Sequence, residues 1–281
     1  NAGMMDCKKA LKETDGDMAK AIDFLREKGL SQAAKKSGRI AAEGLTTATI
    51  SQCGKKGVVL EVNSETDFVA KNEEFQKFVA DTAQIILDTN PSDVEALKAT
   101  QYPGEGKNVQ EVLTEKIAKI GENMSIRRFK FVEAANGAVV SYIHGGGKIS
   151  VLVSLESEGD KAALEDLGKD LAMQVAAMNP KYISREDVDQ DYIAHEREIL
   201  IHQALNEGKP QNIVEKMVEG RLNKELKEVC LLEQAFVKDG DISVSKYISN
   251  IAAKIGKEIK IADVQRFEVG EGIEKKSENF A

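Results

Sequence analysis

The chain has 281 residues, with 39 Lys and Arg against 47 Asp and Glu and a formal net charge of −8. This acidic balance argues against a protein that mainly neutralises the phosphates of nucleic acid, so no direct nucleic-acid partner is expected. No apolar run approaches the roughly 18 residues that a membrane span needs, so no membrane partner is expected either. Trp is absent, and the three cysteines, with no CxxC pair, are typical of reduced thiols in a cytosolic protein.

Residues 1–30 predict a small helical N-terminal domain of two short helices. Asp17 offers an N-cap oxygen to the second helix, whose apolar residues recur at helical spacing: Met18, Ala21, Ile22 and Leu25. Two such helices bury little surface, so we expect either a missing first helix or support from another part of the protein. Residues 31–47 contain few large apolar side chains and predict a linker. Its basic cluster, Lys35, Lys36 and Arg39, is interpreted as a solvated face rather than a phosphate site.

Residues 48–135 predict an α+β unit. Strand-like runs at 48–53 and 58–62 flank a turn that holds two glycines, which is typical of a hairpin. A long helix follows, with one apolar stripe: Phe75, Phe78, Val79, Thr82 and Ile86. A second helix ends at Gly121 and has its own stripe: Val109, Val112, Leu113, Ile117 and Ile120. Residues 125–133 predict a third strand.

The same order of elements recurs later in the chain. Residues 141–154 again indicate a strand, a glycine-rich turn and a strand, and the helix that follows has the stripe Leu164, Leu167, Leu171, Val175 and Met178. The string Ala-Lys-Ile-Gly at 118–121 returns at 253–256, and Arg-Phe at 128–129 returns at 266–267. We therefore predict the fold class α+β with a duplicated core, whose second subdomain comprises residues 136–183 and 230–275. Residues 276–281 are a C-terminal tail.

Residues 184–229 exceed what the repeat requires and predict an insertion in the second subdomain. A spacing of 4, 3, 4 and 3, which is that of a coiled-coil seam, connects Val188, Tyr192, His195, Ile199 and His202. A turn at 208–210 precedes a second helical stretch. We predict an antiparallel helical hairpin, which either serves docking and dimerisation or packs back on its own subdomain.

Several strings imitate catalytic motifs but lack a residue that the chemistry requires. His195-Glu196 could begin a zinc-protease helix, yet Ile199 stands where the second ligand belongs. His195 and His202 are two helical turns apart, about 10 Å, which is too far for one metal ion. The glycines after His144 fit a hairpin turn, and no G-x-S-x-G elbow accompanies them. We therefore expect no catalytic residue, no metal, no cofactor and no enzymatic activity.

One segment, residues 65–71, leaves two interpretations open. Phe68 lies seven positions before Phe75, so by helical phase it could extend the buried stripe of the following helix. It could equally be an exposed hydrophobic residue on the loop between strand and helix, suited to a pocket of a partner protein.

Several longer strings resemble the translation elongation factor Ts family, in the family's own order and across essentially the whole chain. They are Met4–Leu11, Thr66–Lys71, Lys119–Asn123, Ile126–Arg128, Lys216–Arg221 and Arg266–Lys275. The family has another helix before the Met4-Met5 segment, and the chain departs from the pattern there. The resemblance implies a ubiquitin-associated-like N-terminal domain, two similar α+β subdomains and an inserted helical hairpin that acts as a dimerisation module.

The resemblance also implies a guanine-nucleotide exchange factor of translation elongation. Such a protein binds elongation factor Tu with GDP or without nucleotide, disturbs its magnesium and phosphate site, and promotes GDP release so that GTP can bind. It makes and breaks no covalent bond. The family implies a bacterial cytoplasmic location, and an organelle matrix stays open. The alternative is an adaptor that uses the same surfaces without exchanging nucleotide.

By the same resemblance, the site residues lie around the Asp-Phe pair. Phe68 would wedge between helices of the GTPase, and Asp67 would perturb its magnesium-binding side, while Thr66 and Val69 would hold the loop. Further contacts with the GTP-binding domain would be Met4, Met5 and His144. The tail after Glu268 and the second subdomain would hold other parts of the GTPase, and a homodimer through residues 184–229 stays open.

Overall fold

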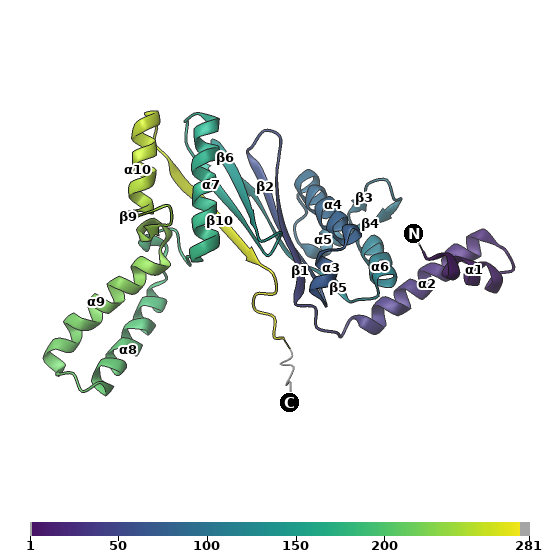
Figure 1. Ribbon diagram of the computed structural model, residues 1–281, viewed down its shortest axis with the longest axis horizontal. Coiled ribbons are helices and arrows are strands. Elements are labelled where there is room, and N and C mark those ends of the chain that lie inside the picture. Colours follow the sequence, from purple (N-terminus) through teal and green to yellow (C-terminus); the bar gives the residue numbers. More distant parts are fainter. Residues whose placement is uncertain (1, 276–281) are drawn as a thin grey trace. The chain divides into compact units, whose positions relative to one another are not determined.

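The structure of the protein is a computed structural model that describes residues 2–275 (Figure 1). Helices combine with small sheets whose registered strand pairs are antiparallel, which confirms the predicted α+β class. The predicted C-terminal tail, residues 276–281, lies outside the described residues. Within residues 2–275, no helix is both long and apolar enough to cross a membrane.

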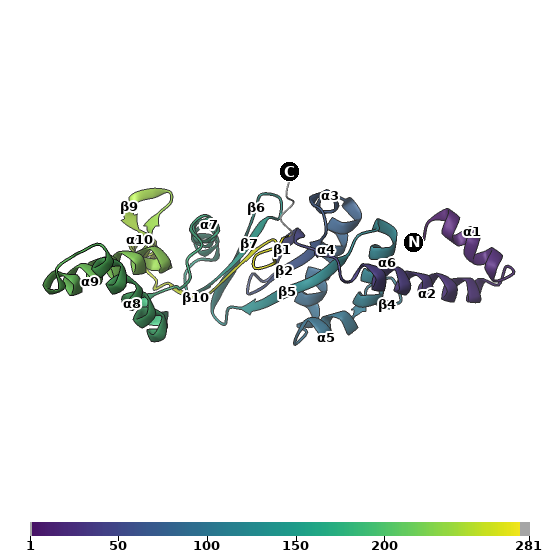
Figure 2. The same ribbon diagram turned by 90° about the horizontal axis from the view of Figure 1, so that it is seen from below.

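The helices α1 (Met4–Glu13) and α2 (Met18–Lys36) lie side by side near the N-terminus (Figure 1, Figure 2). The carboxylate of Asp17 caps α2 by accepting a hydrogen bond of 3.1 Å from the amide of Lys20, as predicted. However, α2 continues to Lys36 and the next strand begins at Glu43, so the linker predicted over 31–47 is wrong for most of its length. Ala and Lys are strong helix formers, and Ala33 also packs against a hydrophobic core.

An antiparallel sheet in the order β1-β2-β5 follows. Its strands are β1 (Glu43–Ile50), β2 (Lys56–Ser64) and β5 (Met124–Glu133). The turn between β1 and β2 contains Gly54 at φ 72°, and the register pairs Ala48 with Val59. Between β2 and β5 come α3 (Asp67–Ala70), α4 (Glu73–Thr89), α5 (Val94–Ala99), β3 (Gln101–Tyr102), β4 (Lys107–Asn108) and α6 (Val109–Ile120). The three predicted strands are therefore present, although β1 begins earlier than predicted.

The core against this sheet lies between β2 and the helices α4 and α6. β2 contributes Val58, Leu60 and Val62. The predicted stripe of α4 is fully buried, and that of α6 is buried except for Ile120, which packs against the edge of the core. α4 ends at Asn90 and α6 ends at Gly121, both with a left-handed backbone that terminates a helix.

The second sheet has the order β10-β7-β6. Its strands are β6 (Gly137–His144), β7 (Ile149–Glu156) and β10 (Lys260–Glu268), and the elements between β7 and β10 include α7 (Lys161–Met178), β8 (Ala235–Phe236), β9 (Asp239–Ser243) and α10 (Val244–Ile255). Two strands, a long helix, a small hairpin, a helix and a strand thus occur twice in the chain. The caps repeat as well, since Asn179 ends α7 and Gly256 ends α10 with a left-handed backbone. Met178 departs from the predicted stripe because it is 49% exposed at the last position of α7.

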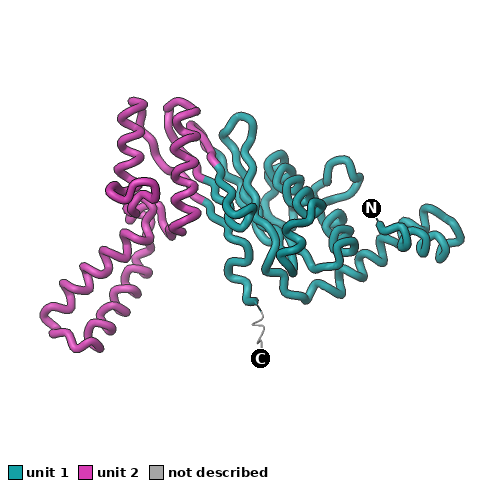
Figure 3. Tube along the Cα trace, in the orientation of Figure 1, with its two compact units in different colours: residues 1–133, 141–152, 265–281 teal, residues 134–140, 153–264 magenta. Residues whose placement is uncertain are grey.

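The chain divides into two compact units (Figure 3). Unit 1 comprises residues 1–133, 141–152 and 265–281, and unit 2 comprises residues 134–140 and 153–264. The division runs through β6, β7 and β10, so each unit contains part of these strands. The predicted subdomains, 48–135 and 136–183 with 230–275, stay a prediction.

In unit 2, α8 (Gln190–Asn206) and α9 (Gln211–Val229) form a helical hairpin within residues 184–229 (Figure 1). Short 3-10 helices, Arg185–Asp187 and Leu231–Glu233, lie on either side of it. α9 buries Val214, Val218, Leu222 and Leu226 at a regular spacing of one helical turn. The two ends of the insertion meet where Tyr182 and Cys230 form an isolated bridge.

In its second half, the predicted seam of α8 does not face α9, so packing of the seam within the hairpin is wrong there and docking stays a prediction. Val188 is buried and Tyr192 is half-buried, but three residues are exposed: His195, Ile199 and His202. α9 instead meets the side of α8 that carries Leu200 and Ala204. α8 has apolar residues around more than one side, so a 4-3 spacing did not identify the side that α9 covers.

A buried charge lies in the middle of β2 in unit 1. The side chain of Glu61 has 0% exposure, and its carboxylate accepts hydrogen bonds from the Arg128 Nε (2.7 Å), Arg127 Nη1 (3.1 Å), Asn63 Nδ2 (3.0 Å) and the Gly270 amide (2.7 Å). A buried carboxylate is costly unless such groups surround it. Gly270 has φ 74°, and a Cβ there would lie 2.2 Å from the Ala42 carbonyl oxygen, so only glycine fits. Glu61 therefore holds the segment after β10 against β2.

Candidate partner-binding site

The Phe68 segment, residues 65–72, connects β2 to α4 and contains α3, a helix of a single turn. The amide of Lys71 donates to the carbonyl of Phe68 at 3.1 Å, and the amide of Asn72 donates to the carbonyl of Val69 at 2.9 Å. Asn72 then caps α4, since its side-chain oxygen accepts a hydrogen bond of 3.0 Å from the amide of Phe75. α3 and α4 are therefore separate helices.

Phe68 is 77% exposed, and the side chain of Asp67 is 64% exposed. The interpretation of Phe68 as a core residue is wrong, because the helix breaks at Asn72 and the phase set by Phe75 does not extend across the break. Lys71 lies beside both residues, with Nζ 3.9 Å from the Asp67 carboxylate and 5.9 Å from the centre of the Phe68 ring. Such exposed contacts contribute little to stability, so the pair is available to a partner.

The residues on either side of Asp67 and Phe68 are fixed by contacts with the rest of unit 1. On the C-terminal side, Val69 is 6% exposed and belongs to the hydrophobic core. On the N-terminal side, Thr66 makes two hydrogen bonds with Glu122: the amide donates to Oε2 at 3.0 Å and Oγ1 donates to Oε1 at 2.6 Å. Sequence reasoning missed Glu122, whose only signal was its place in the string Lys119–Asn123 that resembles the family.

Glu65 strengthens the same connection. Its Oε1 accepts a hydrogen bond of 2.6 Å from the amide of Asn123 and lies 3.4 Å from Nη1 of Arg39. The side-chain amide of Asn123 donates to the carbonyl of Arg39 at 2.8 Å. The start of the Phe68 segment, the end of α6 and the chain before β1 are thus connected through polar groups.

The other predicted contact residues lie on separate elements of unit 1. Met4 and Met5 are exposed on α1, by 86% and 74%. His144 is exposed at the end of β6, where the Tyr142 hydroxyl lies 3.0 Å from its Nδ1. Within residues 2–275, no hydrogen bond, ion pair or ring contact joins these three residues to the Phe68 segment.

The turn after His144 is fixed by β1. The carbonyl of Gly147 accepts hydrogen bonds from both the amide (2.7 Å) and Oγ1 (2.9 Å) of Thr46. Gly147 has φ 105°, and a Cβ there would lie 2.9 Å from the Thr46 carbonyl oxygen. Glycine is therefore required where the turn approaches β1, which agrees with the hairpin interpretation of these glycines.

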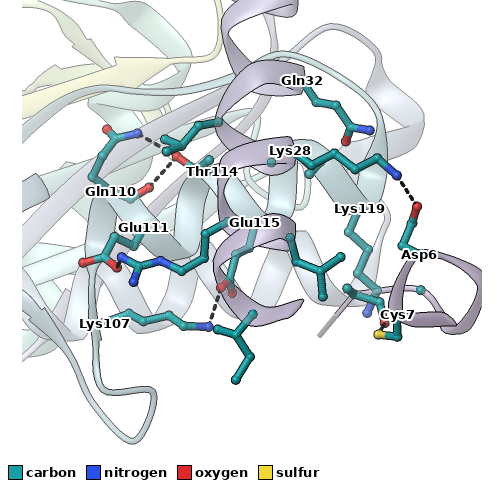
Figure 4. Close-up of a pocket in the computed structure, with 18 residues that line it drawn as sticks. Asp6, Cys7, Lys28, Gln32, Lys107, Gln110, Glu111, Thr114, Glu115 and Lys119 are labelled. Carbon is teal, nitrogen blue, oxygen red and sulfur yellow. Dashed lines mark hydrogen bonds and ion pairs between the residues drawn. The ribbon is translucent and has the colours of Figure 1, made fainter. Parts of the chain in front are cut away.

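A groove of about 330 Å³ lies between α1, α2 and α6 in unit 1. Figure 4 shows that Lys28 points toward Asp6 and Lys107 toward Glu115, and both are ion pairs. Arg26 likewise pairs with Glu111 at 3.1 Å. The Lys28–Asp6 and Arg26–Glu111 pairs join different helices of the groove, and the Lys107–Glu115 pair lies along its α6 side. Among the residues that the structure describes, no group of three His, Cys, Asp or Glu side chains could hold a metal ion.

Two of the tyrosines with a raised pKa, Tyr102 and Tyr247, donate hydrogen bonds to carboxylates outside the Phe68 segment. Burial, and then a hydrogen bond of 2.6 Å to Asp81, raise the pKa of Tyr102. Burial and a hydrogen bond of 2.5 Å to Asp170 raise the pKa of Tyr247 in the same way. In each case the neutral phenol donates to a carboxylate, so both hydroxyls have a structural role.

Aromatic residues are enriched at protein–protein interfaces, so an exposed Phe on a firmly held turn is suited to binding another protein. A family model described as Elongation factor TS matches residues 65–271. The Elongation factor Ts of Clostridioides difficile (strain 630) is 60% identical over 280 residues, covering 100% of this chain and 92% of the relative. Proteins of the same name from Clostridium perfringens (strain SM101 / Type A) and Syntrophotalea carbinolica are 56% and 51% identical, with the same coverage.

The chain belongs to the elongation factor Ts family, which confirms the resemblance read from its strings. This family supports a nucleotide-exchange role in translation elongation and implies elongation factor Tu as the partner.

Proposed function

We propose that the protein binds elongation factor Tu in its GDP-bound and nucleotide-free forms and promotes GDP release, so that GTP can bind. The observation that supports this most directly is Phe68, which is 77% exposed between two residues that unit 1 holds, Thr66 and Val69. No covalent bond is made or broken, because exchange is a sequence of binding steps. The protein is proposed to act in the bacterial cytoplasm.

Exchange of this kind depends on differential binding. A nucleotide dissociates slowly while its phosphates and magnesium ion are held in the GTPase. A partner that binds the nucleotide-free GTPase more tightly than the GDP form lowers the affinity for GDP by the same factor. The exchange factor therefore needs a rigid group that occupies space or alters charge near the magnesium site.

The Phe68 segment supplies both kinds of group. We assign Phe68 to a wedge between helices of the GTPase and Asp67 to a perturbation of its magnesium-binding side. Thr66 and Val69 keep the segment in its conformation. Met4, Met5 and His144 are assigned to further contacts with the GTP-binding domain, since all three are exposed.

Self-association through residues 184–229 is a second part of the proposal. Three apolar residues of the hairpin remain exposed: Ile199 (37%), Leu205 (47%) and Ile213 (45%). Apolar side chains at these positions would be covered if the hairpins of two chains paired.

The test measures release of a fluorescent GDP analogue from elongation factor Tu, with and without the full chain. Faster release that requires only catalytic amounts of the chain is expected, with the acceleration depending on magnesium concentration. Binding without acceleration would identify an adaptor and contradict the proposal. If the chain neither binds elongation factor Tu nor accelerates GDP release, elongation factor Tu is not its partner.

A further inference from the structure

Glu122 lies two residues after the end of α6 and reaches back to the Phe68 segment. Its two carboxylate oxygens accept separate hydrogen bonds from Thr66, one from the amide at 3.0 Å and one from Oγ1 at 2.6 Å. Hydrogen bonds to an ionised carboxylate are stronger than those between neutral groups. Thr66 stands 56 positions away in the sequence, so this contact joins two distant parts of unit 1.

The contact changes what Thr66 does for α3. A Thr at the N-cap normally accepts a hydrogen bond from an amide in the first turn of its helix. In α3 the Thr66 side chain makes no such bond, and its hydroxyl instead donates to Glu122. A helix of one turn is unstable on its own, so α3 depends on contacts outside itself.

The end of α6 is itself suited to this task. Gly121 has φ 87° and turns the chain sharply after the helix, which places Glu122 and Asn123 beside the Phe68 segment. Asn123 then bonds Glu65 through its amide and Arg39 through its side chain. Two consecutive residues after α6 thus hold two consecutive residues before Asp67.

We propose that Glu122 is a positioning residue for nucleotide exchange, which holds Phe68 and Asp67 in the orientation that the GTPase requires. This inference rests on the proposed function of the Phe68 segment. Without Glu122 the side chain of Phe68 remains, but the amide and the hydroxyl of Thr66 both lose their hydrogen-bond partner. The hydrogen bond of 2.9 Å from Ser64 Oγ to the Thr66 carbonyl is then the remaining contact of Thr66 itself on this side. The free energy of ordering α3 must then be supplied when the partner binds, which weakens the interaction.

The experiment compares Glu122→Ala with Glu122→Gln in the full chain. Gln keeps both contacts, since its carbonyl can accept from the Thr66 amide and its NH2 can donate to Oγ1. Glu122→Ala is expected to lower kcat/KM for GDP release about tenfold, because partner binding must then supply the free energy of ordering roughly one side chain and its turn. Glu122→Gln should remain within about threefold of the original protein. Glu74→Ala is the matched control, because Glu74 also bridges to α6, through Lys116 and Lys119, but has no hydrogen bond or ion pair with Thr66.

A combined variant separates positioning from a general loss of structure. If Glu122 acts through Phe68 and Asp67, adding Glu122→Ala to a variant that carries both Phe68→Ala and Asp67→Ala should lower release by less than about twofold further. A full tenfold loss in that background would overturn the inference, as would equal effects of Glu122→Ala and Glu74→Ala. Should Glu122→Ala unfold, Thr66→Val and Thr66→Ser make the same comparison, with loss expected only for Val, which lacks the hydroxyl.

The outcome also distinguishes this inference from the proposed function. If Phe68→Ala alone leaves GDP release unchanged, the proposed function of the segment fails. If Phe68→Ala slows release and Glu122→Ala does not, the positioning role alone fails.

Discussion

Phe68 and Phe75 are residues of one type in one short stretch of chain, and the structure gives them opposite environments. Phe75 has 0% exposure in the core of unit 1, whereas Phe68 is 77% exposed on α3. Changing each to Ala therefore removes the same atoms from a packed core in one case and from solvent in the other. The pair provides a matched test of what the Phe68 ring does.

The expected magnitudes are well separated. Phe75→Ala leaves a cavity and should lower the free energy of unfolding by about 3–5 kcal/mol. Phe68→Ala removes a ring that is mostly in solvent, so the free energy of unfolding should change by less than about 0.5 kcal/mol. At about 2–4 °C per kcal/mol for domains of this size, Phe75→Ala should lower Tm by roughly 10 °C and Phe68→Ala by about 2 °C at most.

Nucleotide exchange should respond in the opposite order. An aromatic residue at the centre of an interface can supply about 2 kcal/mol or more, so Phe68→Ala should slow GDP release about thirtyfold. Phe75→Ala should retain exchange per folded molecule at a temperature where it stays folded. The assay runs thermal melts beside release of fluorescent GDP from elongation factor Tu. A large fall in Tm for Phe68→Ala with unchanged release would refute the reasoning.

Three further predictions concern other parts of the molecule. Asp67→Ala should keep the Tm of the original protein, because the Asp67 side chain is exposed. The variant should slow GDP release by a factor that becomes smaller as magnesium is removed. A factor that stays constant across a magnesium titration would contradict the role assigned to Asp67. Replacing residues 184–229 by a short glycine bridge should leave a folded protein, because Tyr182 and Cys230 already lie next to each other. The deletion should alter the oligomeric state or the partner affinity more than it alters magnesium-dependent GDP release. An aggregated product in light scattering would show that the hairpin belongs to the core. Because the pKa of Tyr102 is raised in the folded protein, its phenol loses its proton at a lower pH in the unfolded chain than in the folded one. The contribution of Tyr102 to stability is therefore fully present below about pH 10 and is lost as the pH rises above it. Urea unfolding between about pH 8 and 11 should therefore show stability falling with pH, less steeply in Tyr102→Phe, and equal slopes would disprove this linkage.

The sequence predicted the elements whose periodicity is set by one dominant core face. The stripes of α4 and α7 and the strands on either side of them were found because apolar residues recur on the face that meets the sheet. Periodicity failed where a helix is interrupted or apolar on several sides. The phase of Phe75 could not be carried to Phe68 across Asn72, and the second half of α8 has apolar residues on both the covered and the exposed side.

Polar contacts between distant residues were beyond sequence reasoning. Thr66, Asp67, Phe68 and Val69 were selected because of the family resemblance, and nothing in the spacing indicated that Glu122 reaches Thr66. The burial of Glu61 was equally hidden, since a charged residue in a strand normally predicts a solvent-facing position. Such contacts depend on the tertiary fold, which brings together residues that no local pattern connects.

The ligands of Glu61 have a consequence for synthesis of the chain on the ribosome. Its neighbours Asn63, Arg127 and Arg128 are available as soon as the sheet β1-β2-β5 can form, but the amide of Gly270 is 209 positions away and emerges much later. Nascent chains fold their N-terminal parts first, so the sheet forms with one hydrogen bond of its buried carboxylate still unmade. Synthesis of the segment that holds Gly270 supplies this last hydrogen bond, and a chain that terminates before Gly270 keeps an unmade hydrogen bond in the middle of its first sheet.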